Sequence, residues 1–398
     1  MPKKSAGAAT ALPVVRISRR GADRLRSGHV WVYRSDIASA DGVSPGALVG
    51  VVNERGRFLG SALYSSASQI AIRMVSSDAV LDLQGLLRER LAAAVAYRER
   101  VVRDSDAYRV VFSEADSLPG LIVDRYNDIV SFQVLTQAMD AESMRETLVS
   151  SLDEQMQPAA IVERVDPRVR EAERLPPREP SLVRGEKTTT IFAMNGIRFH
   201  CAALEGQKTG AFLDQRENYL AAAQYARGDA LDVFCYQGGF ALHLAPHCNT
   251  VTAVDSSRPA LEVADRNAAL NGREIEWIEA NAFDLLKDYA AAGRQYDTIV
   301  LDPPAFAKSK RNLDTALRGY KELNLRALKM LRPGGVLVSC SCSYHVGEAE
   351  FAQMLAEAAA DTHRRLRLLE RRGQAKDHPM VLSIPETSYL KCFIAIVI

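Results

Sequence analysis

The stretch Leu231-Asp-Val-Phe-Cys-Tyr-Gln-Gly-Gly-Phe240 joins a short apolar run to a pair of glycines and then to a helical pattern. A strand, a glycine-rich turn and a helix in this order open a βαβ unit, where doubly wound sheets bind nucleotide-like ligands. Gly238 and Gly239 carry no Cβ atom, so they would let the backbone approach a ligand. Asp255 closes the next apolar run, about 20 residues further on, where an acidic residue takes a ribose hydroxyl pair.

The chain around this stretch alternates between strand and helix patterns from about residue 193 onward. Alternation of this kind predicts an α/β fold with a parallel sheet covered by helices on both faces. Ligands then bind at the carboxyl ends of the strands, near Gly238, Asp255, Asn281, Asp302 and Cys342. The expected strands are residues 230–234, 251–254, 275–278, 296–301, 335–341 and 390–398, and one expected helix is 315–331.

The glycine loop separates two classes of nucleotide-binding enzyme. A nicotinamide oxidoreductase would show G-x-G-x-x-G after the first strand, and Cys235-Tyr-Gln-Gly-Gly239 lacks that pattern. The loop better matches the first motif of class I methyltransferases, which bind S-adenosylmethionine (SAM). Asp232 would then lie near the methionine ammonium group, and Asp255 would bind the ribose. Asn281, after the third strand, would lie where the adenine amino group is read.

A second segment, Lys208 to Arg216, precedes the first strand and is expected to lie over the cofactor, with Arg216 pairing with the SAM carboxylate. The full set of residues predicted to bind SAM is Phe212, Asp214, Arg216, Asp232, Phe234, Tyr236, Gly238, Gly239, Asp255, Asn281, Ala282 and Asp302.

Asp302-Pro-Pro-Ala-Phe306 ends the fourth strand. The prolines fix the turn and aim the Asp302 carboxylate at a planar ligand. An aspartate and two prolines followed by an aromatic residue are typical of the substrate-base site in methyltransferases. Phe306 would either stack on a flipped base or pack beneath the loop. The predicted contacts to the substrate base are Pro303, Pro304, Phe306 and Lys308.

Ser339-Cys-Ser-Cys-Ser343 ends the fifth strand. Methylation of cytosine at C5 needs a thiolate that adds to C6, because C5 by itself is a poor nucleophile. Alternation along a strand places Cys340 and Cys342 on one face, with Cys342 nearer the ligand edge. Cys342 is therefore the candidate nucleophile, with two packed thiols as the alternative interpretation.

The part of the chain before residue 193 carries no catalytic signature. Residues 14–80 read as short strands separated by turns, which predicts a small β-barrel. Basic residues beside Trp31 and Tyr33 fit stacking on a nucleic acid, and core packing of these two rings is an equal alternative. A helix at 83–102, a hairpin at 121–135 and a proline-containing junction at 166–190 indicate a central α+β region.

Composition and charge set the remaining limits. The 398 residues carry a net charge of +1, which is no global nucleic-acid signature. Basic clusters at 3–26 and 308–321 nevertheless suggest either a phosphate-binding face or solvated surface. The six cysteines form no CxxC pair or zinc set, so no metal is expected. We find no export signal and no apolar run of membrane length, and predict a cytoplasmic protein without membrane contact.

Taken together and in this order, the motifs resemble the large-subunit ribosomal RNA cytosine-C5 methyltransferases that carry an N-terminal PUA domain. The motifs are Gly28-His-Val-Trp-Val-Tyr33, Ala67-Ser-Gln-Ile-Ala-Ile-Arg73, Leu118-Pro-Gly-Leu-Ile-Val-Asp-Arg125, Lys208-Thr-Gly to Asp214-Gln-Arg216, Asp302-Pro-Pro304, Arg318-Gly-Tyr-Lys-Glu-Leu-Asn324 and Ser341-Cys-Ser343. The resemblance implies that Cys342 and not Cys340 is the nucleophile, and that the enzyme is often dimeric. Val30, Asn281 and Tyr344-His345 depart from the family pattern, and the last of these bears on the target nucleotide.

The resemblance also implies the domain order. We expect a disordered tail at 1–11, an RNA-binding PUA domain at 12–82, a central α+β domain at 83–192 and a Rossmann-like SAM domain at 193–398. The predicted function is SAM-dependent methylation of cytosine C5 in ribosomal RNA, with Cys342 and Asp302 as the catalytic residues. Two alternatives stay open: methylation of a base nitrogen at Asp302-Pro-Pro304, and a non-catalytic RNA-binding assembly factor.

Overall fold

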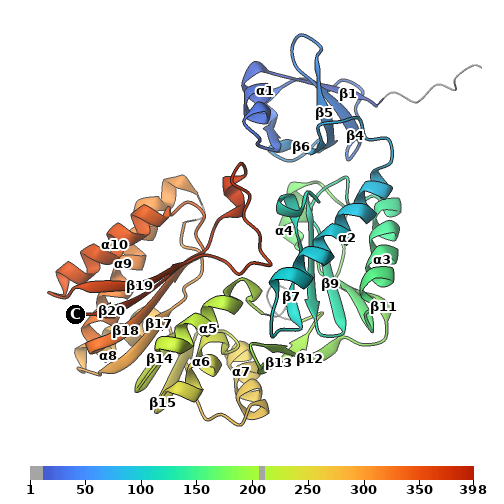
Figure 1. The fold of residues 1–398 in the computed structure, drawn as a ribbon. Helices are drawn as coiled ribbons and strands as arrows, with labels where there is room; N and C mark the ends of the chain where they lie inside the picture. Colours follow the sequence, from blue (N-terminus) through green and yellow to red (C-terminus); the bar gives the residue numbers. More distant parts are fainter. Residues whose placement is uncertain (1–11, 206–210, 308) are drawn as a thin grey trace, which may run out of the picture. The chain divides into compact units, whose positions relative to one another are not determined.

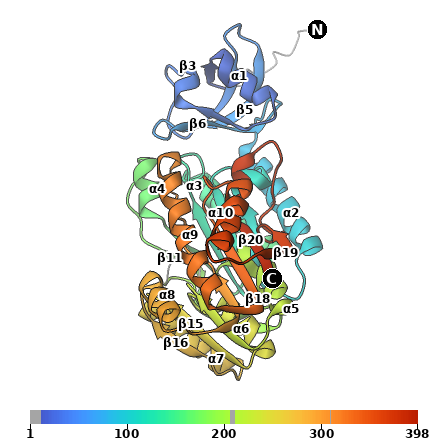
Figure 2. The ribbon, with the colours of Figure 1, turned by 90° about the vertical axis from the view of Figure 1, so that its left-hand side faces the viewer.

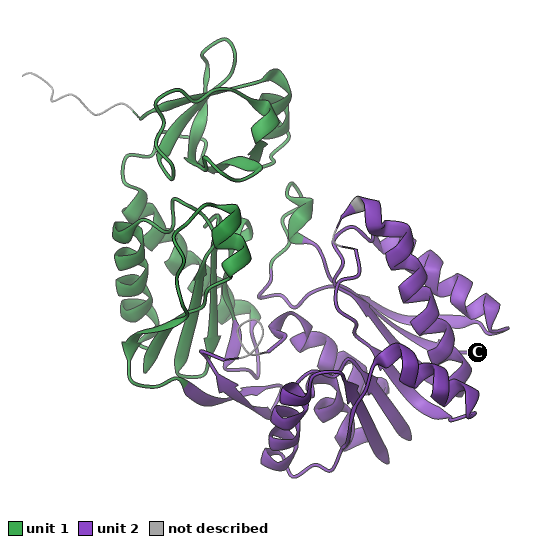
Figure 3. Cartoon of the chain, turned by 180° about the vertical axis from the view of Figure 1, so that it is seen from behind, with its two compact units in different colours: residues 1–101, 109–188, 379–387 green, residues 102–108, 189–378, 388–398 purple. Residues whose placement is uncertain are grey.

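The computed structural model describes residues 12–205, 211–307 and 309–398. The predictions made for the tail at 1–11, for Lys208 and for Lys308 fall outside these ranges. The chain divides into two units, coloured separately in Figure 3. Unit 1 comprises residues 1–101, 109–188 and 379–387, and unit 2 comprises residues 102–108, 189–378 and 388–398.

Unit 1 begins with the small β domain that the turn-punctuated strands predict (Figure 1). Its six strands pair in the order β2-β6-β5-β4-β1-β3. Alternating side chains such as Val15 and Ile17 fill the core, since successive residues of a strand face opposite sides. The elements are β1 Val14–Ile17, α1 Arg19–Arg26, β2 Trp31–Tyr33, β3 Ile37–Ser39, β4 Leu48–Val52, β5 Phe58–Tyr64 and β6 Ile70–Ser76.

The second part of unit 1 is the central α+β region. Its sheet has the order β11-β10-β9-β8-β7, and the helices α2 and α3 pack against each other. The predicted hairpin is confirmed, with Asn127 in the left-handed conformation that a two-residue turn requires (φ 53°). The elements are α2 Leu83–Val101, β7 Ala107–Phe112, β8 Leu121–Tyr126, β9 Ile129–Val134, α3 Glu142–Met156, β10 Ala160–Glu163, α4 Pro167–Ala172 and β11 Ser181–Gly185.

The junction expected at 166–190 is more ordered than a loop. Asp166 caps the short helix α4 by accepting hydrogen bonds from the backbone of Arg168 and Val169, and Pro167 occupies the first helical turn. The following strand β11 pairs antiparallel with β10. Pro167 therefore marks the start of a helix, within a segment that the sequence suggested to be a linker.

Trp31 does not lie open for stacking. Its indole Nε1 donates to Glu114 Oε1 of the central region at 2.9 Å, and its ring meets the His29 ring edge-on. Arg24 lies over the Tyr33 ring, with its guanidinium carbon 4.6 Å from the ring centre. Of the two interpretations of this aromatic pair, packing within the protein describes Trp31 better.

Unit 2 contains the seven-stranded sheet, in the order β16-β15-β14-β17-β18-β20-β19. The prediction of an entirely parallel sheet is wrong at one side, because β20 runs antiparallel to both β18 and β19. A buried strand is apolar on both faces whichever way it runs, so its sequence does not encode its direction. The strands are β14 Asp229–Val233, β15 Thr250–Asp255, β16 Glu276–Glu279, β17 Tyr296–Leu301, β18 Leu331–Ser341, β19 Leu366–Arg372 and β20 Lys391–Val397.

Helices cover both faces of this sheet (Figures 1 and 2). The helices α8, α9 and α10, which face the viewer in Figure 2, bury Leu286, Leu323 and Phe351 in the main core of the unit. The opposite face carries α5, α6 and α7. The helices are α5 Arg216–Tyr225, α6 Gly239–Leu244, α7 Arg258–Leu270, α8 Ala282–Ala291, α9 Leu313–Met330 and α10 Glu348–Asp361, and an additional hairpin is formed by β12 Thr189–Met194 and β13 Ile197–Ala202.

No helix among the described residues has the length and apolar character needed to cross a bilayer.

Candidate cofactor and substrate site

The carboxyl ends of the central strands of unit 2 meet at one edge of the sheet. The register pairs Val233 with both Val254 and Leu301, and Leu301 with Ser339, so β14, β15, β17 and β18 end at similar heights. The structure thereby brings together Gly238, Asp255, Asp302 and Cys342, each of which follows or ends one of these strands. We take this edge as the candidate site.

The loop after β14 has an unusual backbone. Phe234, Tyr236 and Gly238 all have positive φ angles, of 68°, 49° and 86°. Left-handed conformations are costly for residues with a side chain, and they persist only where the surroundings enforce them. Here the Val254 carbonyl accepts both the Phe234 N–H at 2.9 Å and the Cys235 N–H at 3.0 Å.

The glycine pair is needed for contacts within the protein. A Cβ atom on Gly239 would lie 2.5 Å from Tyr219 Oη, and one on Gly238 would lie 2.9 Å from the Trp277 ring. From the sequence, these glycines are expected to admit a ligand. The structure adds another reason, since side chains of the protein itself occupy the space that a Cβ would need.

Asp232 is the most unusual charged residue at this edge. Its side chain is 0% exposed, and Oδ2 accepts the Ala241 N–H at 2.9 Å. The other oxygen, Oδ1, is buried and has no hydrogen-bond partner. Burial raises the pKa of this carboxyl to about 8, and repulsion by Asp302 and Asp255 adds to the effect. A buried acceptor without a hydrogen bond costs free energy, and a cationic donor from a ligand would remove that cost. The ammonium group of SAM is a donor of this kind.

Asp255 and Asn281 both accept hydrogen bonds from nearby backbone N–H groups. The two carboxylate oxygens of Asp255 accept the backbone N–H groups of Tyr236 and Ser257, each at 2.9 Å. Each oxygen retains a lone pair, so the carboxylate still fits a ribose hydroxyl pair.

Asn281 caps α8, and its Oδ1 accepts the Phe283 N–H at 2.9 Å. Asn281 and the buried Ala282 thus form the helix start, and the amide oxygen expected to read adenine is engaged in the cap.

The segment before α5 is held from within the protein. Phe212 meets the Tyr236 ring edge-on at 5.0 Å, and Asp214 Oδ2 accepts the Tyr389 hydroxyl at 2.7 Å. Arg216 is 2% exposed and pairs with the buried Asp377, Nη2 to Oδ1, at 2.8 Å. Asp377 thus engages Arg216 Nη2, while the buried Nε has no hydrogen-bond partner among the described residues, and the pairing of Arg216 with the cofactor carboxylate stays a prediction.

The Asp302 loop forms the adjoining part of the edge. Gln215 Nε2 donates to Asp302 Oδ1 at 3.0 Å, a contact that no sequence pattern predicts. Pro303 is buried, whereas Pro304 is exposed. Phe306 packs against Tyr320, with ring centres 4.7 Å apart, and a Cβ atom on Gly319 would lie 3.3 Å from its ring. Of the two interpretations of Phe306, packing beneath the loop is the one that the structure shows.

The two cysteines at the end of β18 have different surroundings. Cys340 is fully buried and faces Cys392 of β20, and burial raises the pKa of its thiol well above the usual value. Cys342 lies one position beyond the strand and is half-buried, with Sγ 3.9 Å from the Pro303 carbonyl oxygen. Cys342 is thus the accessible member of the pair and lies next to the predicted base site.

Three further residues fix this strand end. The Ser343 hydroxyl lies 2.9 Å from the Tyr320 hydroxyl and accepts the Ala307 N–H at 3.2 Å. Lys391 Nζ donates to the Ser343 carbonyl. The sequence does carry a signal for Lys391, because it is the one charged residue in the apolar run Lys391-Cys-Phe-Ile-Ala-Ile-Val-Ile398. Within the described ranges, no group of side chains could hold a metal ion.

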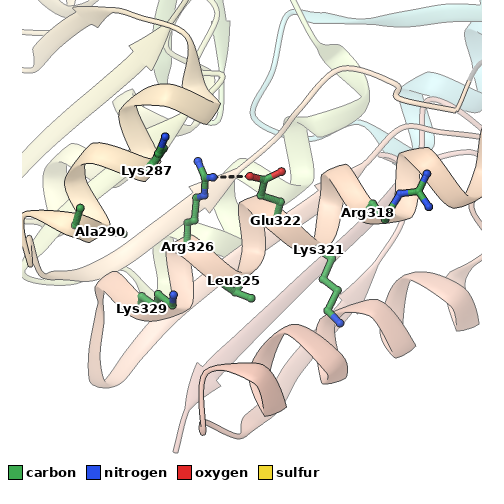
Figure 4. Close-up of a pocket in the computed structure, with 9 residues that line it drawn as sticks. Lys287, Ala290, Arg318, Lys321, Glu322, Leu325, Arg326 and Lys329 are labelled. Carbon is green, nitrogen blue, oxygen red and sulfur yellow. Dashed lines mark hydrogen bonds and ion pairs between the residues drawn. The ribbon is translucent and has the colours of Figure 1, made fainter.

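A separate basic groove lies between α8 and α9 of unit 2 (Figure 4). Arg326 pairs with Glu322 on one side of it, and Lys321 pairs with Glu357 and Asp361 of α10. Lys287, Arg318 and Lys329 are exposed, and the described part of the chain offers them no carboxylate. The groove is a charged surface outside the strand-end site.

Comparison with known proteins identifies a domain family for each of two parts of the chain. A family model described as a PUA-like domain matches residues 15–77, and one described as an S-adenosylmethionine-dependent methyltransferase matches residues 153–392. A Shewanella denitrificans protein named ribosomal RNA large subunit methyltransferase I is 39% identical over 384 residues, covering 93% of this chain and 96% of its own. A Photobacterium profundum protein of the same name is 38% identical over 382 residues, covering 93% and 95%.

Solved structures agree on the fold. The crystal structure of SMU.776, described as a methyltransferase complexed with SAH, superposes with a TM-score of 0.83 at 18% identity, covering 96% of this chain and 99% of that one. A SAM-dependent methyltransferase structure from Streptococcus mutans gives 0.81 with the same coverage. At this identity the likeness bears on the fold alone.

The fold and the strand-end site define a SAM-dependent methyltransferase with a Rossmann-like catalytic domain and an N-terminal PUA-like domain. Within that class, the chain belongs to the family of the ribosomal RNA large subunit methyltransferases I.

The buried carboxyl of Asp232 yields a prediction about proton release. Its pKa of about 8 keeps it protonated at pH 7 in the free protein, and a bound ammonium group would favour the ionised form. SAM binding should therefore release close to one proton per site, and affinity should rise as the pH approaches 8. Calorimetric titration in buffers of different ionisation enthalpy measures this proton directly.

Asp232→Asn is the matched control for protons that come from SAM itself. The variant should bind SAM roughly 10–100-fold more weakly, the size of one charge-assisted hydrogen bond. The proton release attributed to Asp232 should be lost. Equal proton release by both proteins would contradict the assignment of Asp232 to the ammonium group.

Proposed function

We propose that this protein methylates C5 of a cytosine in large-subunit ribosomal RNA, with SAM as the methyl donor and Cys342 as the covalent nucleophile. The observation that carries the proposal is the accessible Cys342 thiol at the end of β18, 3.9 Å from the Pro303 carbonyl of the Asp302-Pro-Pro304 turn. A methyltransferase that acts on a base nitrogen has no use for a thiol in this place.

The proposed reaction balances through one covalent adduct. The Cys342 thiolate adds to C6 of the cytosine, and the electron pair of the C5–C6 double bond moves onto C5. Bound SAM would supply an electrophilic methyl group: C5 would form a bond to the methyl carbon as the methyl–sulfonium bond breaks, and S-adenosylhomocysteine would leave. A base then removes the C5 proton, the double bond re-forms and the Cys342 thiolate leaves. The protein is regenerated without an oxidant or a reductant.

Asp302 has the position of the group that orients the base. Asp302 directly follows β17, and its carboxylate accepts a hydrogen bond from Gln215, whose side-chain oxygen accepts one from Asn218 at 2.7 Å. A carboxylate fixed in this way can accept a hydrogen bond from the amino group of a cytosine. Asp302 is also our candidate for the base that removes the C5 proton. Pro303 and Pro304 would line the base site beside it, whereas Phe306 supports the loop from below.

Ribosomal RNA is the proposed substrate because the related proteins carry that name and because a PUA-like domain accompanies the catalytic one. Such a substrate also supports the predicted cytoplasmic location. A homodimer stays a prediction from the family resemblance.

The basic surfaces of the two units differ in how many of their charges are already used in ion pairs within the protein, and therefore in how well they could bind RNA phosphates. On α1, Arg20 and Arg24 share the carboxylate of Asp36, so much of that cluster is committed to the fold. The groove of unit 2 keeps Lys287, Arg318 and Lys329 exposed. One end of it lies near the Asp302 loop, since Phe306 of that loop packs against Tyr320, two positions after Arg318 in α9. We assign this groove to phosphates of the RNA strand next to the target base.

Replacement of the nucleophile separates C5 methylation from methylation of a base nitrogen. Cys342→Ala should lower methyl transfer to ribosomal RNA by more than about a thousandfold, because the thiolate acts in the chemical step. Calorimetry should show unchanged SAM binding. Cys248→Ala, which removes a half-buried thiol elsewhere in unit 2, should keep full activity. Undiminished methylation by Cys342→Ala would leave nitrogen methylation as the function, and activity lost together with SAM binding would point to misfolding.

Charge reversal in the groove tests the RNA surface. Lys287→Glu combined with Lys329→Glu should weaken RNA binding at every sequence and flatten its salt dependence, by about 0.7 in the log–log slope for each lost phosphate contact. SAM binding should not change. Arg273→Glu reverses an exposed charge after α7 and serves as the control. An equal salt slope for the double variant and the control would exclude the groove from the RNA interface.

A further inference from the structure

Lys391 places a buried amine beside the proposed nucleophile. Its side chain is 7% exposed, and Nζ donates to the Ser343 carbonyl at 2.6 Å and to the Tyr389 carbonyl at 2.8 Å. Ser343 directly follows Cys342. The residue lies in β20 opposite Ser341 of β18, so its side chain reaches along the edge of the sheet to the strand end.

The described residues provide no carboxylate that forms an ion pair with this amine. Burial of an ammonium group without a paired carboxylate is costly, and it lowers the pKa of Lys391 to about 8. The amine is therefore still mostly protonated at neutral pH, although it titrates far below an ordinary lysine. Two carbonyl oxygens offset part of the cost, since each accepts one of its three N–H groups.

Three acidic groups are close enough to act on the Lys391 charge. Cys342 has the largest effect of the three, ahead of Glu348 and Glu350 at the start of α10. Both glutamates are engaged elsewhere: Glu348 pairs with Arg371 at 3.0 Å, and Glu350 accepts the Gly347 N–H at 2.5 Å. The Cys342 thiol is thus the principal acidic neighbour of the buried amine.

We propose that Lys391 is a positioning residue that acts through Cys342, stabilising the thiolate form of Cys342 and holding the Ser343 carbonyl so that the thiol stays at the sheet edge. A neighbouring ammonium group favours a thiolate over a thiol. The proton that Cys342 releases passes to Lys391 where the amine is neutral, and to solvent otherwise. Its importance for catalysis rests on the proposed function, whereas its effect on the thiol does not.

The test follows alkylation of Cys342 by iodoacetamide from pH 5.5 to pH 10, in protein without SAM or RNA. Mass spectrometry of the peptide that contains Cys342 distinguishes it from the other five cysteines. The pH midpoint is the measured quantity, because the rate per thiolate falls as the thiol becomes more acidic and would mask part of the effect. Wild-type protein should give a midpoint below about 8.5, the value of an unperturbed cysteine.

Lys391→Gln removes the charge and keeps an N–H donor for the two carbonyls. The midpoint for Cys342 should rise by about one pH unit, a tenfold smaller thiolate fraction at neutral pH. Lys391→Arg keeps the charge and should restore most of the wild-type midpoint. Lys329→Gln removes an exposed charge from α9 and should leave the midpoint unchanged.

A wild-type midpoint at or above 8.5 overturns the proposal, and this result depends on no variant being folded. An unchanged midpoint in Lys391→Gln that still binds SAM overturns it as well. Failure of the proposed function would give a different result. In that case Cys342→Ala would retain methylation, while the Lys391 variants would still shift the pH midpoint of Cys342 alkylation. The two conclusions can therefore fail independently.

Discussion

The site depends on the hydrogen bonds that tie the loop after β14 to the end of β15. The Val254 carbonyl accepts two consecutive N–H groups, from Phe234 and Cys235, and Asp255 accepts the Tyr236 N–H. These bonds enforce the left-handed conformations of Phe234 and Tyr236, which such residues rarely adopt. The turned loop starts α6 directly behind Asp232 and leaves one carboxylate oxygen of that residue without a partner. The strained loop and the unsatisfied acid are thus two results of one arrangement, and the unsatisfied acid suits a cationic ligand.

The proposed substrate side of the edge is built from the other half of the sheet. Its two components, the Asp302 turn and the end of β18, are linked by the Ser343 hydroxyl, which accepts the Ala307 N–H and contacts Tyr320 of α9. Strand β20 adds Lys391 from the far end of the chain. The cofactor half is therefore organised by backbone bonds, whereas the substrate half relies on buried side chains from three separate elements.

Local patterns explain which expectations were accurate. The strand at 229–233, the hairpin around Asn127 and the helix of α9 each carry their signal within a short window, so the sequence predicted them closely. The protein partners of Arg216 and Asn281, in contrast, could not be predicted from the sequence. Asp377 lies 161 positions from Arg216 and still neutralises it, and Asn281 serves the start of its own helix. A motif shows which residue types are present, but not which partners they find.

The sequence by itself determined the class of the catalytic domain, the order of the domains, and the placing of Asp232, Asp255, Asp302 and Cys342 at strand ends. Periodicity and turn residues are local properties, and the carboxyl ends of parallel strands necessarily share an edge. The tertiary structure alone decided that β20 enters the sheet antiparallel between β18 and β19. That direction brings Lys391 beside Ser343, because only an antiparallel neighbour begins where β18 ends. The electrostatic surroundings of Cys342 follow from this long-range pairing, which no local pattern encodes.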